Sequence, residues 1–254
     1  MRQSVFAIVF ALICGSVSSP LLAQDVAPSV PAPETQAAPV TQDIPQIQLP
    51  PTHNFASQFM RDEAGIWSAP FRVKRGEARW LLPIGVGAAA LFAVDSRVAH
   101  AANRSESLRS PSKFVSHFGS TQAMGGASAS LWAIGKFTHN DRLSETGSLA
   151  TQAVLHTQLV VSSLKFLSQR QRPNGVDKKS FPSGHAATSF AFASVVARQY
   201  HDKPMIVIGS YGLATAVSLS RMGGLNHFPS DVLVGAVIGE LIGRYLIHHH
   251  AAQE

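Results

Sequence analysis

From Glu77 onward, apolar residues recur at the spacing of an α-helix, and no segment shows the sustained alternation of a strand. Clusters of Gly, Pro and polar residues divide this region into separate helical segments. The pattern predicts six helices, near residues 77–101, 112–137, 142–168, 184–201, 205–220 and 230–248. We therefore expect an all-α fold, built as a single bundle of about six helices.

The start of the chain has the pattern of an export signal. Arg2 supplies a positive charge, Val5 to Cys14 form an unbroken apolar run, and Ala23 is a small residue suited to precede a cleavage site. We predict a signal peptide over residues 1–23. An uncleaved anchor helix is the alternative.

The segment after the signal is rich in proline. Residues 24–52 hold seven of the fifteen prolines, set among Ala, Gln, Val and Thr. Because this composition cannot bury a core, we predict a disordered linker. Residues 53–76 are assigned to an N-terminal extension, and residues 77–248 to the functional domain.

The predicted helices are marginal as membrane spans. The apolar run from Trp80 to Val94 has 15 residues, fewer than the ~20 that a span needs. The next two helices carry many Ser, Thr, Gln and His residues, which suits a buried bundle in water at least as well as lipid. The last two helices are more apolar and leave the question open.

The composition of the chain limits the classes of molecule that it is expected to bind. Charged residues make up only 14% of the chain, and the formal net charge is +6. A basic balance favours anionic partners such as phosphates or lipid headgroups. No basic run is interleaved with aromatic residues, so we expect no nucleic-acid binding. The scattered histidines show no metal-ligand spacing, and no metal is expected.

A first chemistry-bearing cluster contains Lys165, Arg172 and Pro173. Lys165 and Arg172 are seven residues apart, which on a helix is two turns, so both cations would emerge on one face. Two cations aimed at one place suit a doubly charged anion. The alternative is that they only complement the dipole at a helix C-terminus.

A second cluster is Pro182-Ser183-Gly184-His185, directly before an apolar helix. Ser183 is a candidate N-cap, and the free N–H groups of the helix N-terminus would bind an anion. His185 would stand beside that anion and could protonate a leaving group. An ordinary capped helix start with an incidental histidine is the alternative.

A third cluster runs from Ser220-Arg221 through Gly223 and Gly224 to His227 and Asp231. Asp231, four residues after His227, could reach back to one imidazole nitrogen. That contact would leave the other nitrogen free to attack. A lone His–Asp pair is often structural, so this cluster alone decides nothing.

Taken together, the three clusters resemble the motifs of the type 2 phosphatidic acid phosphatase (PAP2) superfamily, which includes bacterial acid phosphatases and vanadium haloperoxidases. The matching pattern is Lys–x6–Arg–Pro, then Pro–Ser–Gly–His, then Ser–Arg–x5–His–x3–Asp, all within residues 165–231. No key position is substituted. The resemblance implies a PAP2/haloperoxidase-like helical fold extending over about residues 77–247.

The resemblance also implies roles for these residues. His227 would attack phosphorus to form a phosphohistidine, Asp231 would orient His227, and His185 would protonate the leaving group and then help to activate water. The phosphate oxygens would be held by Lys165, Arg172, Ser183, the Gly184 amide and Arg221. No cofactor is implied, and vanadate is expected to inhibit.

The function expected from the resemblance is hydrolysis of a phosphate monoester or diphosphate, on a phosphorylated lipid or a small molecule. The alternatives are a vanadate-dependent haloperoxidase using the same pocket, and a non-catalytic phosphate- or lipid-binding scaffold. A scaffold would be expected to have lost His185, His227 or Asp231, and all three are present.

Location follows from the signal and the helices. Membrane relatives hold the three motifs on the outer face of six spanning helices with a cytoplasmic N-terminus, which a cleaved signal would contradict. We therefore expect an exported protein of the periplasm or cell envelope, either soluble or membrane-associated. Gly235, Gly239 and Gly243 recur every four residues and predict close helix packing in either case.

Overall fold

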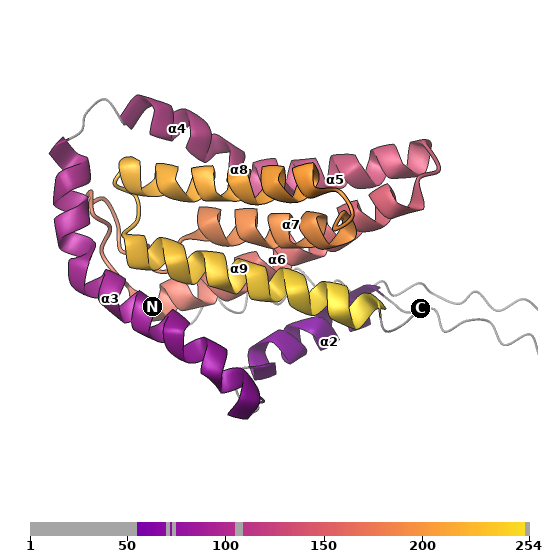
Figure 1. Cartoon of the computed structure of the whole chain (residues 1–254), viewed down its shortest axis with the longest axis horizontal. Coiled ribbons are helices and arrows are strands. Elements are labelled where there is room, and N and C mark those ends of the chain that lie inside the picture. Colours follow the sequence, from indigo (N-terminus) through magenta and orange to yellow (C-terminus); the bar gives the residue numbers. More distant parts are fainter. Residues whose placement is uncertain (1–54, 70–71, 73–74, 105–108, 252–254) are drawn as a thin grey trace, which may run out of the picture. The chain divides into compact units, whose positions relative to one another are not determined.

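The computed structural model describes residues 55–69, 72, 75–104 and 109–251. The predicted signal peptide (1–23) and linker (24–52) lie outside the described residues. Within them the chain is helical without a strand, which confirms the all-α prediction (Figure 1). The helices are α2 (Phe55–Ser68), α3 (Arg75–Arg104), α4 (Arg109–Phe118), α5 (Thr121–Phe137), α6 (Asp141–Ser168), α7 (Gly184–Gln199), α8 (Pro204–Gly223) and α9 (Pro229–Ala251).

The most enclosed helix is α7, which contacts α5, α6, α8 and α9. Figure 1 shows it between α8 and α9. Its sequence permits this position because Ala186, Ala187 and Ala191 are small and fully buried. Close contact on several sides fixes where the N-terminus of α7 lies.

Three glycines on α9 allow it to lie directly against α7. A Cβ at Gly235 would overlap the carbonyl oxygen of Ser183, and one at Gly239 would overlap that of Ala187. A Cβ at Gly243 would crowd the Ser194 side chain. The predicted close packing is therefore confirmed, and it brings the N-termini of α7 and α9 together.

One predicted helix is wrong in extent. The segment 112–137 is two helices, α4 and α5, separated at Gly119 and Ser120. Ser120 caps α5 by accepting a hydrogen bond from the Ala123 amide at 3.1 Å. A Cβ at Gly119 would overlap Val217 of α8, and the Gly119 carbonyl accepts a hydrogen bond from Thr188 Oγ1 at 3.1 Å. The break therefore lets the chain fit between α7 and α8.

Helix α2 lies in the segment that sequence analysis treated only as an extension. The Phe59 ring stacks on the His156 ring of α6 at 4.1 Å, and Glu63 pairs with Nδ1 of the same histidine. Near the end of α9, Asp62 Oδ2 lies 3.2 Å from His250 Nε2. These contacts join α2 to α6 and α9.

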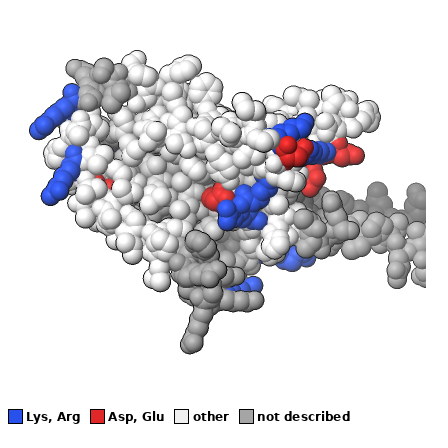
Figure 2. Space-filling view, viewed as in Figure 1, with Lys and Arg blue, Asp and Glu red and all other residues white. Residues whose placement is uncertain are grey.

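Among the described residues, two helical segments are long and apolar enough to cross a membrane, Leu82–Arg104 of α3 and Pro204–Gly223 of α8. Their mean hydropathies are 1.4 and 1.3, and only 6% of the first segment and 28% of the second are buried in the protein. Figure 2 shows the same face of the molecule as Figure 1, with few Lys, Arg, Asp or Glu side chains on it. Low burial distinguishes both segments from the core helix of a water-soluble bundle.

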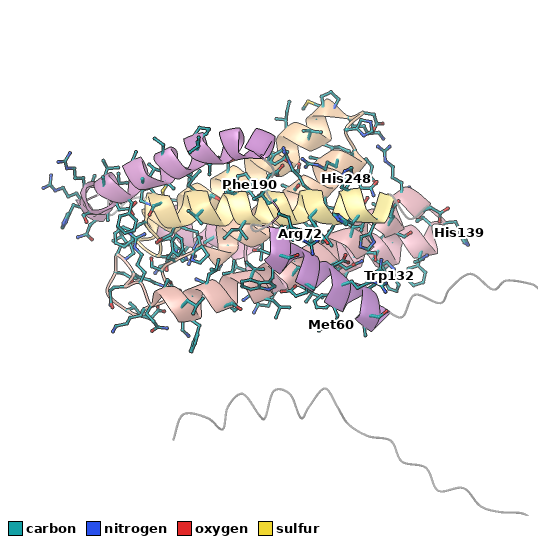
Figure 3. All side chains as sticks on the ribbon, turned by 90° about the horizontal axis from the view of Figure 1, so that it is seen from below. Met60, Arg72, Trp132, His139, Phe190 and His248 are labelled. Atoms are coloured by element: carbon teal, nitrogen blue, oxygen red, sulfur yellow. The ribbon has the colours of Figure 1, made fainter. Side chains whose placement is uncertain are left out.

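Apolar side chains are also exposed on other helices. Met60 on α2 and Trp132 on α5, both labelled in Figure 3, are 67% and 48% exposed. Phe137, at the end of α5, is 84% exposed. The apolar surface is therefore not confined to the two longest apolar segments.

The contact between α7 and α9 gives a stability prediction. Gly239→Ala should lower the free energy of unfolding by about 1–3 kcal/mol, because the added methyl group meets the Ala187 backbone. Gly212→Ala on α8 is the matched control, since nothing lies within 4 Å of a Cβ there, and it should be neutral or stabilising. Denaturant or thermal unfolding measures both, and equal stability of the two variants would contradict the packing.

Candidate functional site

The three motifs meet at one end of the bundle, where two connections lie beside α3 (Figure 1). One is the loop 169–183 between α6 and α7, and the other is the segment 224–228 between α8 and α9. The Asn174 amide donates to the Leu225 carbonyl at 3.2 Å and links them. His139, between α5 and α6, lies at the opposite end of the bundle (Figure 3).

Lys165 and Arg172 do not share a helix face as the spacing predicted. Helix α6 ends at Ser168, and Gln169 adopts a left-handed conformation with φ of 46°. Arg172 therefore belongs to the loop, where its amide donates to the Asp177 carbonyl at 3.0 Å. The two cations come together because the loop turns back, and not because of helical periodicity.

The second motif is the start of α7, as the sequence predicted. Ser183 is the N-cap, and its side chain accepts from the Ala186 amide. The Ser183 amide donates to the Asp231 carbonyl at 2.9 Å, which joins the starts of α7 and α9. A Cβ at Gly184 would lie 3.9 Å from Lys165 Cε, so the lysine side chain reaches this helix N-terminus.

His227 is buried, with 3% of its surface exposed, and its tautomer is fixed. Its Nδ1 lies 2.6 Å from the carbonyl oxygen of Ser180. Since a carbonyl oxygen only accepts hydrogen bonds, Nδ1 carries the proton and Nε2 carries the lone pair. Nε2 has no hydrogen-bond partner within the described part of the chain.

The expected contact from Asp231 to His227 is not a hydrogen bond, because Asp231 Oδ2 lies 3.9 Å from Nδ1. The reason is that other donors occupy the carboxylate. Oδ2 accepts from Ser180 Oγ at 2.5 Å and from the Phe228 amide at 2.9 Å. Asp231 therefore reaches His227 through Ser180, whose side chain it binds and whose carbonyl binds the imidazole.

Arg170 was missed, although it lies inside the first motif. Its Nη1 donates to Asp231 Oδ1 at 2.5 Å and to Ser230 Oγ at 2.8 Å, and its Nη2 donates to Asp95 Oδ2 at 2.6 Å. The guanidinium lies 4.3 Å from the ring centroids of both Phe92 and Phe228. Arg170 is thus held between two rings and joins two buried carboxylates.

Asp95 was missed as well, and the sequence held a signal for it. It is the only acidic residue in the apolar segment Leu82–Arg104, and a buried carboxylate needs a partner. It is 2% exposed, and besides Arg170 it accepts from the Ser230 amide at 3.0 Å. Asp95 thereby fastens α3 to the start of α9.

Arg221 is a buried cation, with 9% of its surface exposed. Its Nη1 donates to Ser116 Oγ of α4, a contact that sequence analysis did not foresee. Its Nε is buried without a hydrogen-bond partner, and no carboxylate pairs with Arg221 among the described residues. Because burying an unpaired cation is costly, this arrangement is typical of an anion-binding site.

The other two cations, Lys165 and Arg172, each have one polar contact within the loop that follows α6. Lys165 Nζ donates to the Lys179 carbonyl at 2.7 Å, and Arg172 Nε lies 2.8 Å from Asp177 Oδ1 without hydrogen-bond geometry. Burial, followed by the charge of Arg172, lowers the pKa of Lys165 to about 8. The lysine therefore remains mostly protonated at pH 7.

The same cations act on both histidines. Burial, followed by Arg221, Lys165 and Arg172, lowers the pKa of His185 to about 3. Burial, followed by the same three charges, also holds the pKa of His227 well below its ordinary value. Both imidazoles are consequently neutral near pH 7 while no anion is bound.

All eight residues predicted for the site therefore come together around the starts of α7 and α9. The arrangement offers a lone pair on a buried imidazole, three cations, a helix N-terminus and a second neutral imidazole. These are the parts that a phosphoryl transfer requires for attack and charge stabilisation. Within the described residues no group of three or more His, Cys, Asp or Glu side chains is placed to hold a metal ion.

The lowered histidine pKa gives a pH prediction. In the unfolded chain a histidine takes up a proton near pH 6.5, whereas His185 in the folded protein does so only near pH 3. Stability should therefore fall as pH drops from about 6.5 toward 4, since the unfolded state binds more protons. His185→Gln should flatten this dependence in phosphate-free buffer, with the exposed His201→Gln as the control. Identical pH profiles of the melting temperature in both variants would contradict a half-buried His185 that stays neutral in the folded protein.

Known proteins resemble this chain in sequence and in fold. Residues 147–253 match the PAP2 superfamily. Over 111 residues the chain is 33% identical to a lipid A 1-phosphatase of Porphyromonas gingivalis, an alignment covering 42% of this chain and 25% of that protein. The chain thus spans about a quarter of the length of this curated relative.

Two solved structures have the same fold. One is a transmembrane PAP2 type phosphatidylglycerolphosphate phosphatase from Bacillus subtilis, with a TM-score of 0.59 and 22% identity over 70% of this chain and 96% of that one. The other is LpxE of Aquifex aeolicus, with a TM-score of 0.52 and 23% identity over 61% of this chain and 95% of that one. Together with the motifs in register, the match over residues 147–253 makes this part of the chain similar to the PAP2 superfamily.

Proposed function

We propose that this chain hydrolyses phosphate monoesters or diphosphates through a phosphohistidine formed on His227. The observation that carries the proposal is the protonated Nδ1 of His227, which donates to the Ser180 carbonyl and leaves the Nε2 lone pair among three cations. The phosphatase named among the curated relatives supports the reaction class. The helical fold shared with the Bacillus subtilis phosphatase is consistent with it.

In the first step, Nε2 of His227 attacks phosphorus, and the bond from phosphorus to the leaving oxygen breaks. Lys165, Arg172 and Arg221 bear the charge on the phosphoryl oxygens, together with the Ser183 side chain and the Gly184 amide. Positive charge develops on the imidazole of His227. The buried carboxylate of Asp231, 3.9 Å from Nδ1, stabilises that charge.

His185 serves as the acid in this step. Without a bound anion, the pKa of His185 is about 3, so its imidazole is neutral near pH 7 and cannot act as an acid. A bound phosphate dianion offsets the three cations that lower this pKa, so substrate binding favours protonation of His185. The imidazolium then protonates the leaving alkoxide, and the alcohol departs.

In the second step, water attacks the phosphohistidine. His185, now neutral, accepts a proton from this water as the new phosphorus–oxygen bond forms. The bond from phosphorus to Nε2 breaks, and inorganic phosphate and free His227 are released. His185 gives the proton taken from water back to the solvent as inorganic phosphate leaves, which balances the proton that it took up when substrate bound.

Arg170 is proposed as a positioning residue for this reaction. It contacts no reacting atom in the scheme, but it holds Asp231 through the 2.5 Å contact and ties it to Asp95. Replacing Arg170 by Ala would leave two buried carboxylates without their cation. The charge and orientation of Asp231 thus depend on it.

We propose further that the substrate is a lipid phosphate and that the enzyme is membrane-associated. The apolar surfaces of α3 and α8, with Val86, Phe92 and Ile208 more than half exposed, support this location. The lipid A phosphatase among the relatives acts on a lipid by its name, as does the Bacillus subtilis phosphatase. Export through the predicted signal remains part of the proposal.

A first experiment tests the nucleophile. Purified protein should hydrolyse a chromogenic phosphate ester, and His227→Ala should reduce kcat by at least about 1,000-fold, since the attacking group is lost. The exposed His201→Ala is the matched control and should keep its activity. Vanadate should inhibit the unmodified protein by mimicking pentacoordinate phosphorus. Equal activity of the two variants would overturn the assignment, and bromide oxidation with vanadate and peroxide would favour the haloperoxidase alternative.

A second experiment tests the location. We expect the protein to sediment with membranes and to remain there after washes with high salt and carbonate, because apolar surface and not charge holds it. Detergent should release it. Recovery in the soluble fraction without detergent would contradict membrane association while leaving the catalytic proposal intact.

A further inference from the structure

A cavity adjoins the catalytic residues. It has a volume of about 710 Å³ and lies between α3, α4 and the two loops of the site. Its lining includes His100, Asn103, Lys113, Arg172, Asn174 and Phe228. Arg172 is thus shared, because it lines this cavity and also acts on His185 and His227.

The cavity is larger than transfer of a phosphoryl group requires. Volumes of about 300–1,000 Å³ are typical of pockets that enclose a whole small molecule. Since the phosphate is held around Lys165, Arg172 and Arg221, the space beyond Arg172 is available to the alcohol part of a substrate. Part of the wall belongs to the first and third motifs, but the cavity extends to residues outside all three motifs, on α3 (Ser96, Ala99 and His100) and on α4 (Lys113).

The lining has one sign of charge. Lys113 of α4 and Arg172 of the loop face the same space, together with the imidazole of His100, and no Asp or Glu is among the lining residues. In a cleft with low-dielectric walls, cations of one sign attract anions. Lys113 belongs to none of the three motifs, so the phosphate at His227 does not explain it.

An apolar groove lies on the other side of the same wall. It has a volume of about 440 Å³ and is lined by Ala102, Pro111, Val115, Leu219 and Met222, among others. Ser112 and Gly223 line the groove, while their neighbours Lys113 and Gly224 line the charged cavity. A charged cavity and an apolar groove side by side fit an amphiphile.

Resting on the proposed function, we infer that the charged cavity binds the alcohol portion of the lipid phosphate, and that this portion carries a second anionic group contacted by Lys113. Acyl chains lie toward the apolar groove. Arg172, between the two anions, contacts the phosphoryl group on one side and faces the alcohol portion on the other. The preferred substrate class is therefore a lipid phosphomonoester with an additional negative charge near the scissile bond.

The test compares two substrates with identical acyl chains in detergent micelles. Phosphatidate carries one phosphomonoester and no other charge, whereas phosphatidylglycerophosphate carries a phosphomonoester and a phosphodiester anion. Lys113→Gln removes the charge and keeps most of the side chain. We expect the ratio of kcat/KM for phosphatidylglycerophosphate over phosphatidate to fall on the order of 10-fold in this variant, as expected for loss of one charge-assisted contact.

Lys136→Gln is the matched control, because Lys136 is exposed at the end of α5 and lines neither space. Its substrate ratio should equal that of the unmodified chain. An unchanged ratio in Lys113→Gln, or an equal loss for both substrates, would overturn the second anionic group. Failure of the unmodified chain to hydrolyse either lipid would instead count against the proposed function. Circular dichroism of each variant separates these results from misfolding.

Discussion

The site depends on one hydrogen bond, from Nδ1 of His227 to the carbonyl oxygen of Ser180. A backbone carbonyl cannot donate, so it fixes which imidazole nitrogen holds the proton, whereas a hydroxyl could either donate or accept. The carbonyl is itself held, because the Ser180 amide donates to the Arg170 carbonyl and the Ser180 hydroxyl donates to Asp231. The nucleophile is therefore oriented by backbone whose own position is fixed on both sides.

Around that bond, charge is arranged in two opposite ways. In the first, one guanidinium, that of Arg170, binds two buried carboxylates, Asp95 and Asp231, and this group joins α3, the loop after α6 and the start of α9. In the second, the described part of the chain offers no carboxylate partner to the buried Arg221, which lies with Lys165 and Arg172 around the two histidines. The first group holds the helices in place, and the second is balanced only when an anion is present. Burying both groups of charged side chains in one bundle lowers the stability of the fold. Their presence is therefore consistent with a role in binding and catalysis rather than in stability.

The sequence was sufficient for the fold class and for eight of the residues that meet at the site. Five of the six predicted helices correspond to single helices, since their apolar periodicity is long and their ends carry recognisable signals such as Ser183 and Pro229. The break at Gly119 was missed because it arises from the closeness of Val217, a contact about 100 residues away along the chain. Tertiary contacts of this kind leave no local pattern.

Within the site, residue types were easier to predict than contacts. The spacing of His227 and Asp231 suggested a direct hydrogen bond, but Ser180, 47 residues before His227, provides the acceptor. Arg172 was placed on a helix that ends four residues earlier, because the left-handed turn at Gln169 is not encoded by a glycine. Arg170 and Asp95 could have been noticed as charges in or near apolar segments, but their pairing required the fold.

The central claim is that Nε2 of His227 becomes covalently bonded to phosphorus. Rapid quenching of the enzyme with a substrate labelled at phosphorus, followed by peptide mapping, measures this directly. We expect an acid-labile, alkali-stable label on the peptide that contains His227, appearing and decaying within one turnover. Turnover without any such label, or a label on His185 in its place, would contradict the account.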